Sequence, residues 1–198
     1  EISACLVGSE MCIRDSASVD DTCRDISVTC IAPTKTFNLA GLQTAAVYAE
    51  NSILHHRMWR QLNTDEVAEP NAFAIQATIA AFQYGEEWLD ELREYVEKNK
   101  QYVTEFLQEK IPLIHPVAGD ATYLMWLDCR KITESGRQFV KFIRKTSGLY
   151  VSGGNQYGRG GEGFLRVNVA TSKLVVEDGM QRLYESVDAW LKEEKISK

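Results

Sequence analysis

Strand-like and helix-like apolar patterns alternate over residues 111–198, and this order limits the fold more than any other feature of the sequence. β-branched and aromatic runs favour strands, whereas apolar residues at spacings of three and four favour helices with one buried face. The order strand, strand, helix, strand, strand, helix predicts a small α+β unit whose helices pack over one sheet. The elements are an extended piece between Pro112 and Pro116, a strand at 123–127, a helix around Phe139 that Gly148 ends, a short strand at 149–151, an alternating strand at 164–169 and a helix from Leu174 to Trp190.

The first half of the chain carries two strand signals. Ile26–Ile31 is a β-rich run that Ala32-Pro33 brings to an end, which predicts a buried strand leading into a loop. A second strand is expected within 42–49. Three helices are expected after these strands: one capped by Asn51 or Ser52 and reaching Leu62, one from Pro70 to about Tyr84, and a long amphipathic one after Gly85.

Composition and charge exclude several classes of protein. The 198 residues include 22 basic and 28 acidic side chains, a net charge of −6, and the basic ones are scattered. Binding to nucleic acid or to an anionic membrane surface needs clustered Lys and Arg, so neither partner is expected. An apolar run of about 18 to 20 residues, which a membrane span needs, is missing, and the first residues lack the order of a secretory signal, so we expect a cytoplasmic protein.

The cysteines and histidines give no sign of a metal site. Five cysteines occur, with no CxxC pair and no histidine at zinc-ligand spacing, so we expect neither a zinc site nor a disulfide framework. His55 and His56 are adjacent and would point about 100° apart on a helix, since successive helical residues are offset by that angle. Surface roles are expected for both, and a structural role for His115 before Pro116.

Residues 1–16 form a leader that does not continue into the patterns after it. The stretch 5–16 resembles translated sequencing-adaptor read-through, and the chain opens on Glu1 rather than Met. We therefore expect residues 1–16 to be foreign to the fold or disordered, and the chain to be a fragment of a longer protein.

Lys35 is the first candidate for chemistry. It follows a predicted strand and a proline-containing loop, between Thr34 and Thr36. A lysine partly desolvated at the mouth of a sheet favours the neutral amine, which attacks carbonyl groups. The competing interpretation is an ordinary solubilising charge in a surface loop.

Arg166 is the second candidate. Alternation along 164–169 places Leu165, Val167 and Val169 on one face and Arg166 on the other. There the guanidinium presents a fork that suits a carboxylate. The alternative is a pair with a neighbouring Asp or Glu at the sheet edge. The glycine-rich stretch 153–163 lies between two predicted strands, not before a helix, so we interpret it as a mobile or tightly turning segment rather than a phosphate loop.

At this point the residues resemble a known family. The segment Ala32-Pro33-Thr34-Lys35-Thr36-Phe37-Asn38-Leu39-Ala40-Gly41-Leu42 is similar to the lysine segment of class I and II aminotransferase-fold enzymes that use pyridoxal phosphate, and in particular of the carbon–sulfur lyase (cystathionine β-lyase) subgroup of the PatB/MalY type. Segments 70–73 with 85–89, 122–128 and 158–168 agree in order and spacing.

The resemblance implies an α/β chain of fold type I that comprises the end of the large domain and the α+β small domain. The implied divisions are a leader at 1–16, a large-domain remnant at 17–69, connecting helices at 70–110 and the small domain at 111–198. It also implies that Lys35 binds pyridoxal phosphate covalently, that Thr34 touches the cofactor phosphate and that Arg166 holds the substrate α-carboxylate.

The implied activity is a β-lyase reaction that splits cystathionine or a related cysteine S-conjugate into a thiol, pyruvate and ammonia. A class I/II aminotransferase and an inactive fragment of either enzyme are the alternatives. Ala32 and Gln43 stand where many aminotransferases carry Ser and Arg for the phosphate, which favours the lyase. Residues 169–173 depart from the Gly-Cys-Pro-Arg type of segment common in that subgroup. The implied partners are an amino-acid substrate and a second copy of the full-length chain.

Overall fold

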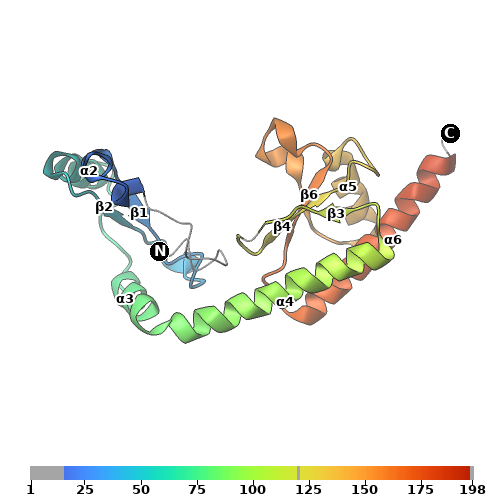
Figure 1. Cartoon of the computed structure of the whole chain (residues 1–198), viewed down its shortest axis with the longest axis horizontal. Coiled ribbons are helices and arrows are strands. Elements are labelled where there is room, and N and C mark those ends of the chain that lie inside the picture. Colours follow the sequence, from blue (N-terminus) through green and yellow to red (C-terminus); the bar gives the residue numbers. More distant parts are fainter. Residues whose placement is uncertain (1–15, 120, 197–198) are drawn as a thin grey trace. The chain divides into compact units, whose positions relative to one another are not determined.

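The computed structural model describes residues 16–119 and 121–196. It consists of two compact units that divide between Arg93 and Glu94, inside the long helix α4 (Glu86–Lys110), and each unit is described by itself (Figure 1). The domain divisions expected at residues 69 and 110 stay predictions. The leader expectation falls, apart from Ser16, outside the described residues.

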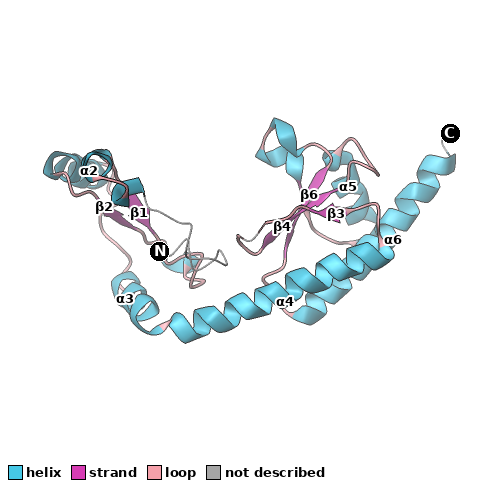
Figure 2. Ribbon diagram, viewed as in Figure 1, coloured by secondary structure: helices cyan, strands magenta, loops and turns pink. Residues whose placement is uncertain are grey.

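The second unit is an antiparallel sheet with helices against one face (Figure 2). Its strands lie in the order β3-β4-β6-β5, and the chain order β3, β4, α5, β5, β6, α6 confirms the predicted succession. The strands are β3 (His115–Pro116), β4 (Leu124–Asp128), β5 (Ser152–Gly153) and β6 (Phe164–Asn168), and the helices are α5 (Gly136–Ser147) and α6 (Lys173–Ile196).

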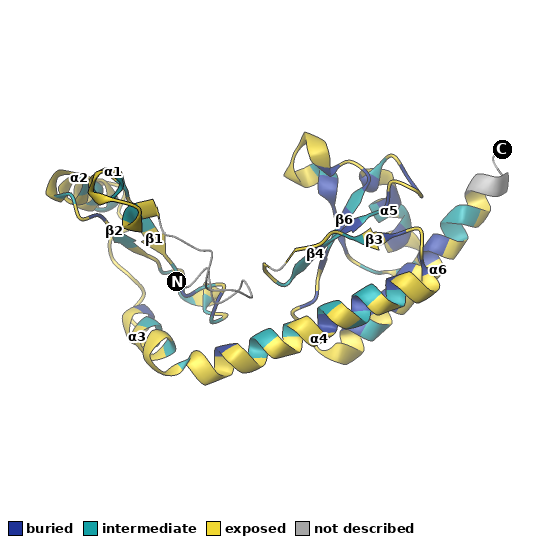
Figure 3. Cartoon of the chain, in the orientation of Figure 1, coloured by how far each residue is buried: buried dark blue, intermediate teal, exposed yellow. Residues whose placement is uncertain are grey.

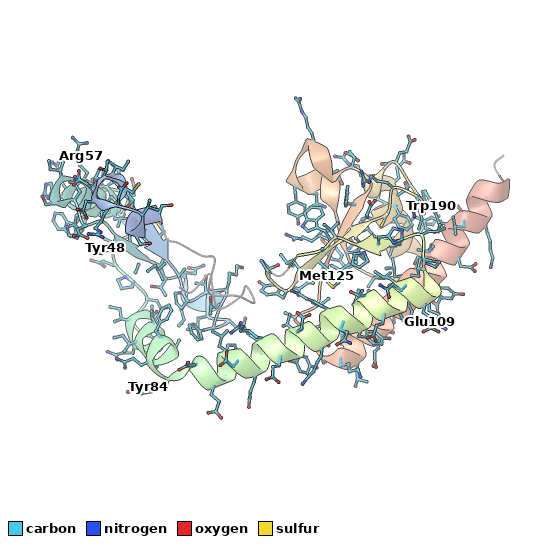
Figure 4. All side chains as sticks on the ribbon, in the orientation of Figure 1. Tyr48, Arg57, Tyr84, Glu109, Met125 and Trp190 are labelled. Carbon is cyan, nitrogen blue, oxygen red and sulfur yellow. The ribbon has the colours of Figure 1, made fainter. Side chains whose placement is uncertain are left out.

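The core of this unit lies between the sheet and the helices (Figure 3). Alternate residues of β4 and β6 are buried, and they meet buried residues from α4, α5 and α6, as the amphipathic patterns predicted. Trp190 of α6, labelled in Figure 4, belongs to this unit. Its ring packs edge-on against Phe139 and Phe142, with ring centroids 5.3 and 5.0 Å apart. The buried set includes Val103, Leu107, Met125, Leu127, Phe139, Ile143, Leu165, Val167, Met180 and Leu183.

The ends of α5 follow its sequence signals. The Ser135 side chain accepts a hydrogen bond from the Gln138 backbone, and Gly148 ends the helix in the left-handed region at φ 73°, as predicted. The strand predicted at 149–151 is wrong: Tyr150 is exposed beside Arg144, and pairing with β6 begins only where Ser152 faces Arg166. Residues 149–151 connect the Gly148 cap of α5 to the sheet, so β5 begins at Ser152 rather than at Leu149.

The first unit holds a two-stranded antiparallel sheet. The predicted strand at 26–31 is shorter than expected, because the Asp20 side chain caps a helix that takes in Ile26. Two strands cover little of each other, so Cys30 and Ile31 are exposed rather than buried. The elements are α1 (Asp21–Ile26), β1 (Thr29–Ile31), β2 (Ala46–Tyr48), α2 (Ser52–Thr64) and α3 (Ala74–Tyr84), with short 3-10 helices η3 (Ser16–Ser18) and η4 (Ala40–Leu42).

The starts of α2 and α3 depend on two asparagines. The Asn51 side chain accepts hydrogen bonds from the backbone of Ile53 and Leu54, which confirms it as the cap of α2. The expected start of α3 at Pro70 is wrong by four residues. The Asn71 side chain accepts from the Phe73 backbone, and this local turn delays the helix to Ala74.

The described residues contain no helix with the length and apolar character that crossing a membrane requires. Nor do they bring together three His, Cys, Asp or Glu side chains that could hold a metal ion.

Candidate active site

Lys35 and Thr34 lie on a tight turn after β1. The Phe37 backbone N–H donates to the Pro33 carbonyl over 2.9 Å, while Pro33 and Thr36 are buried and Lys35 is exposed. The partial burial expected for Lys35 is therefore not provided by this chain's described residues, since the two-stranded sheet leaves the turn open. Across 16–119 and 121–196 no hydrogen bond or ion pair engages the Lys35 amine.

Phe37 anchors this turn, a role that the sequence reasoning missed. Its ring meets Phe82 edge-on at 5.3 Å between centroids and Trp88 at 6.3 Å. Gly85 gives the ring its room, because a Cβ there would lie 2.7 Å from a Phe37 ring carbon. Such a contact is too short to tolerate. The sequence could have indicated this role of Phe37, because the segments 32–42 and 85–89 both match the family pattern. In the structure these two segments pack together through Phe37, Gly85 and Trp88.

Arg166 occupies the central position of the outward face of β6. Its register partners are Trp126 on β4 and Ser152 on β5. The guanidinium carbon lies 4.2 Å from the centroid of the Tyr157 ring, a cation–π contact. No carboxylate pairs with it among the described residues, and the alternative of an acidic partner at the sheet edge stays a prediction.

Arg130, in the same unit, differs from Arg166 because it is paired with a carboxylate. It binds both carboxylate oxygens of Asp128, at 2.9 Å from Nε and 2.6 Å from Nη2, and it also lies over the Phe164 ring. The hydrogen bond from Arg130 lowers the pKa of Asp128 from 3.8 to about 2. Arg130 is therefore occupied, whereas the donors of Arg166 remain available to a ligand.

The glycine-rich segment builds an aromatic hollow beside Arg166. It forms two 3-10 helices, η5 (Gly154–Tyr157) and η6 (Arg159–Gly161), which pack so closely that a Cβ on either Gly154 or Gly161 would clash with the other's backbone. The expectation of a tightly turning segment is confirmed. The hollow has a volume of about 280 Å³ and is lined by Val117, Trp126, Tyr157, Gly160, Gly161 and Phe164.

Helix α4 holds the segment that follows Arg166. The Asn99 side-chain amide is buried and donates to the carbonyls of Val169 and Thr171 over 2.9 and 3.0 Å. Four residues earlier, the Tyr95 hydroxyl accepts a hydrogen bond from the Lys173 backbone over 2.8 Å. The connection between β6 and α6 is thus fixed by side chains of α4.

Cys129 follows Asp128 at the end of β4 and is fully buried. Its backbone N–H donates to Gly163, and desolvation raises the pKa of its thiol to about 12. The free cysteines of the described residues differ in burial, since Cys30 is exposed and Cys129 is buried.

The candidate residues therefore fall into two groups. Thr34 and Lys35 are neighbours on one turn of the first unit, and Arg166 lies on the sheet of the second. Residues 11–183 match the family model for aminotransferases of class I and II. The chain belongs to this family.

Two curated relatives are similar to most of the chain. Cystathionine beta-lyase PatB of Bacillus subtilis (strain 168) is 38% identical over 167 residues, a match that takes in 84% of this chain and 43% of PatB. Protein MalY of Escherichia coli (strain K12) is 30% identical, over 78% of this chain and 40% of MalY. The chain thus spans about two fifths of the length of these relatives.

Solved structures show the same fold. The pyridoxal-phosphate-bound C–S lyase of Staphylococcus hominis superposes with a TM-score of 0.71 at 30% identity, over 82% of this chain and 42% of that one. Cystalysin from Treponema denticola gives a TM-score of 0.89 at 24% identity, over 96% of this chain and 48% of that one. The predicted fold class, α/β of fold type I, is confirmed.

Proposed function

We propose that the protein is a pyridoxal-phosphate-dependent carbon–sulfur β-lyase that splits cystathionine or a related cysteine S-conjugate into a thiol, pyruvate and ammonia. The observation that carries the proposal is the exposed Lys35 amine on a turn anchored by Phe37, an amine to which no described residue bonds. Similarity to PatB and to the S. hominis lyase supports this chemistry over transamination.

The residues on the lysine turn fit the cofactor. An amine that condenses with the cofactor aldehyde must be accessible and free of competing bonds, and within 16–119 and 121–196 Lys35 meets both conditions. The neighbouring Thr34 hydroxyl is a suitable donor to a phosphate. When bound, pyridoxal phosphate supplies an electron sink for the pair left at the substrate Cα.

We assign the remaining steps to two side chains. Arg166 binds the substrate α-carboxylate through its fork. The Lys35 amine takes the proton from Cα as general base. The Cβ–S bond then breaks, and the sulfur leaves with the bonding electrons and is protonated to the thiol. Water hydrolyses the three-carbon remainder to pyruvate and ammonia, so the atoms balance.

The setting of the site is also part of the proposal. We infer a cytoplasmic enzyme that works as a homodimer at full length, with residues 17–69 contributing the lysine turn, 70–110 the connecting helices and 111–198 the small domain.

The test uses the full-length protein that contains this sequence. Incubation with cystathionine is expected to release pyruvate. A 2-oxo acid that retains the whole substrate skeleton would instead establish the aminotransferase, and no product from pure, cofactor-loaded protein would contradict both.

A second experiment tests Lys35 directly. Borohydride reduction of the cofactor-loaded protein followed by peptide mass spectrometry should find the pyridoxyl group on Lys35. Lys35→Ala should abolish this modification and pyruvate release, whereas Lys141→Ala, at an exposed position of α5, should leave both unchanged. A modified lysine elsewhere would remove Lys35 from its role.

A further inference from the structure

We propose that Tyr157 is a positioning residue for Arg166: its ring holds the guanidinium in the orientation that presents the fork to a substrate carboxylate. The inference rests on the carboxylate-binding role of Arg166 in the proposed function. It adds a residue that the lysine segment and Arg166 themselves do not indicate.

The Tyr157 ring restricts the orientation of the Arg166 side chain. Arg166 has a long side chain with many rotamers, and across the described residues it has neither an ion pair nor a hydrogen bond to restrict them. What it does have is the Tyr157 ring, 4.2 Å from the guanidinium carbon. A cation held over a ring face uses none of its N–H donors, so the group is restrained and still free to bind.

The Tyr157 ring is itself held in place by a neighbouring aromatic side chain. Tyr157 meets Trp126 edge-on, with centroids 5.5 Å apart and planes at 80°, and Trp126 meets Phe164 in the same way at 6.2 Å. Trp126 is also the direct register partner of Arg166 across β4 and β6. The contacts thus run from Arg166 to Tyr157, from Tyr157 to Trp126 and from Trp126 to Phe164.

The backbone around Tyr157 also restricts where its ring can lie. Tyr157 ends η5, and Gly158 then turns the chain at φ 123°, a conformation that L side chains rarely adopt. The close packing of Gly154 on Gly161 holds together the two 3-10 helices on either side of Gly158. The Tyr157 hydroxyl donates to no acceptor within the described residues, so the ring, not the hydroxyl, is the feature to test.

A matched control lies elsewhere in the same unit. Arg144 lies over the Tyr150 ring at 4.9 Å, and Tyr150 is exposed and lies before β5, outside the residues that pair with β6. Tyr150→Leu removes a comparable cation–π pair without touching the aromatic hollow. Tyr157→Leu removes the ring beside Arg166, and Tyr157→Phe keeps it.

The kinetic experiment compares these variants in the full-length, cofactor-loaded protein. Tyr157→Leu should raise KM for cystathionine roughly two- to fivefold, the range that an exposed cation–π contact supports, while kcat changes less. Tyr157→Phe should recover most of the loss, and Tyr150→Leu should resemble the parent. Equal KM values for Tyr157→Leu and Tyr150→Leu would overturn the proposal.

A second readout does not depend on catalysis. The side-chain Nε–H signal of Arg166, assigned by its loss in Arg166→Lys, should show greater picosecond-to-nanosecond motion by ¹⁵N relaxation in Tyr157→Leu but not in Tyr157→Phe or Tyr150→Leu. Unchanged relaxation would refute the positioning role even if KM rises. If the parent releases no pyruvate, the proposed function fails, and the relaxation result alone decides whether Tyr157 orients Arg166.

Discussion

Replacing Asn99 by alanine should destabilise the second unit by an amount that its two hydrogen bonds determine. The side-chain amide donates to Val169 and Thr171, and Asn99 is only 2% exposed. Each bond contributes about 1 kcal/mol net, and leaving the buried Val169 carbonyl without a donor adds about 1 kcal/mol more. The expected loss of unfolding free energy is therefore ~3 kcal/mol.

Urea denaturation followed by tryptophan fluorescence measures this loss, because Trp126 and Trp190 both lie in the affected unit. Gln101→Ala is the matched control: its side chain, also on α4, is exposed and bonds only to Glu105. A loss below ~1 kcal/mol for Asn99→Ala, or one equal to the control, would refute the reasoning. It would mean that the β6–α6 connection does not depend on α4.

Three further outcomes are expected. Gly148→Ala places a Cβ at φ 73° and should cost about 1 to 2 kcal/mol in thermal unfolding. Asp128 contributes stability that is fully present above its ordinary pKa of 3.8 and is lost as pH falls through about 2; Asp128→Asn should remove this acid-dependent part, as acid unfolding curves will show. Gly154→Ala would put a Cβ 2.8 Å from the Trp126 ring, so it should lower the midpoint of thermal unfolding and shift the tryptophan emission, whereas Gly160→Ala, with open space around it, should do neither.

The second unit was predictable because its elements are amphipathic and pack on one another. The alternation of Leu165 and Val167 and the helical stripe through Leu183 each identify a buried face, and those faces meet in one core. The one misplaced strand, at 149–151, depends on register, which pairing across β6 decides and local composition does not.

The first unit was less predictable, because its described strands β1 and β2 are short and mostly exposed. The run at 26–31 has the composition of a buried strand, yet it is divided between α1 and a short exposed β1. A side-chain cap at Asp20 outweighed the β propensity of Ile26.

The site was predictable in its residues but not in their surroundings. Residue type and alternation identified Lys35 and Arg166. Nothing local links Arg166 to Tyr157, nine positions earlier, because that contact depends on the fold of the glycine-rich segment. The absence of a carboxylate partner for Arg166 within the described residues likewise becomes visible only in three dimensions.

The buried thiol of Cys129 can be used to measure how often the end of β4 opens to solvent. A thiol with no exposed surface and a pKa near 12 does not react with disulfide reagents while the strand is closed. The rate at which its peptide becomes labelled therefore measures how often this part of the sheet separates from its neighbours, and the exposed Cys30 supplies the rate for an unprotected thiol in the same sample. The labelling rate of Cys129 thus measures local unfolding of β4, the strand that pairs with the Arg166 strand β6.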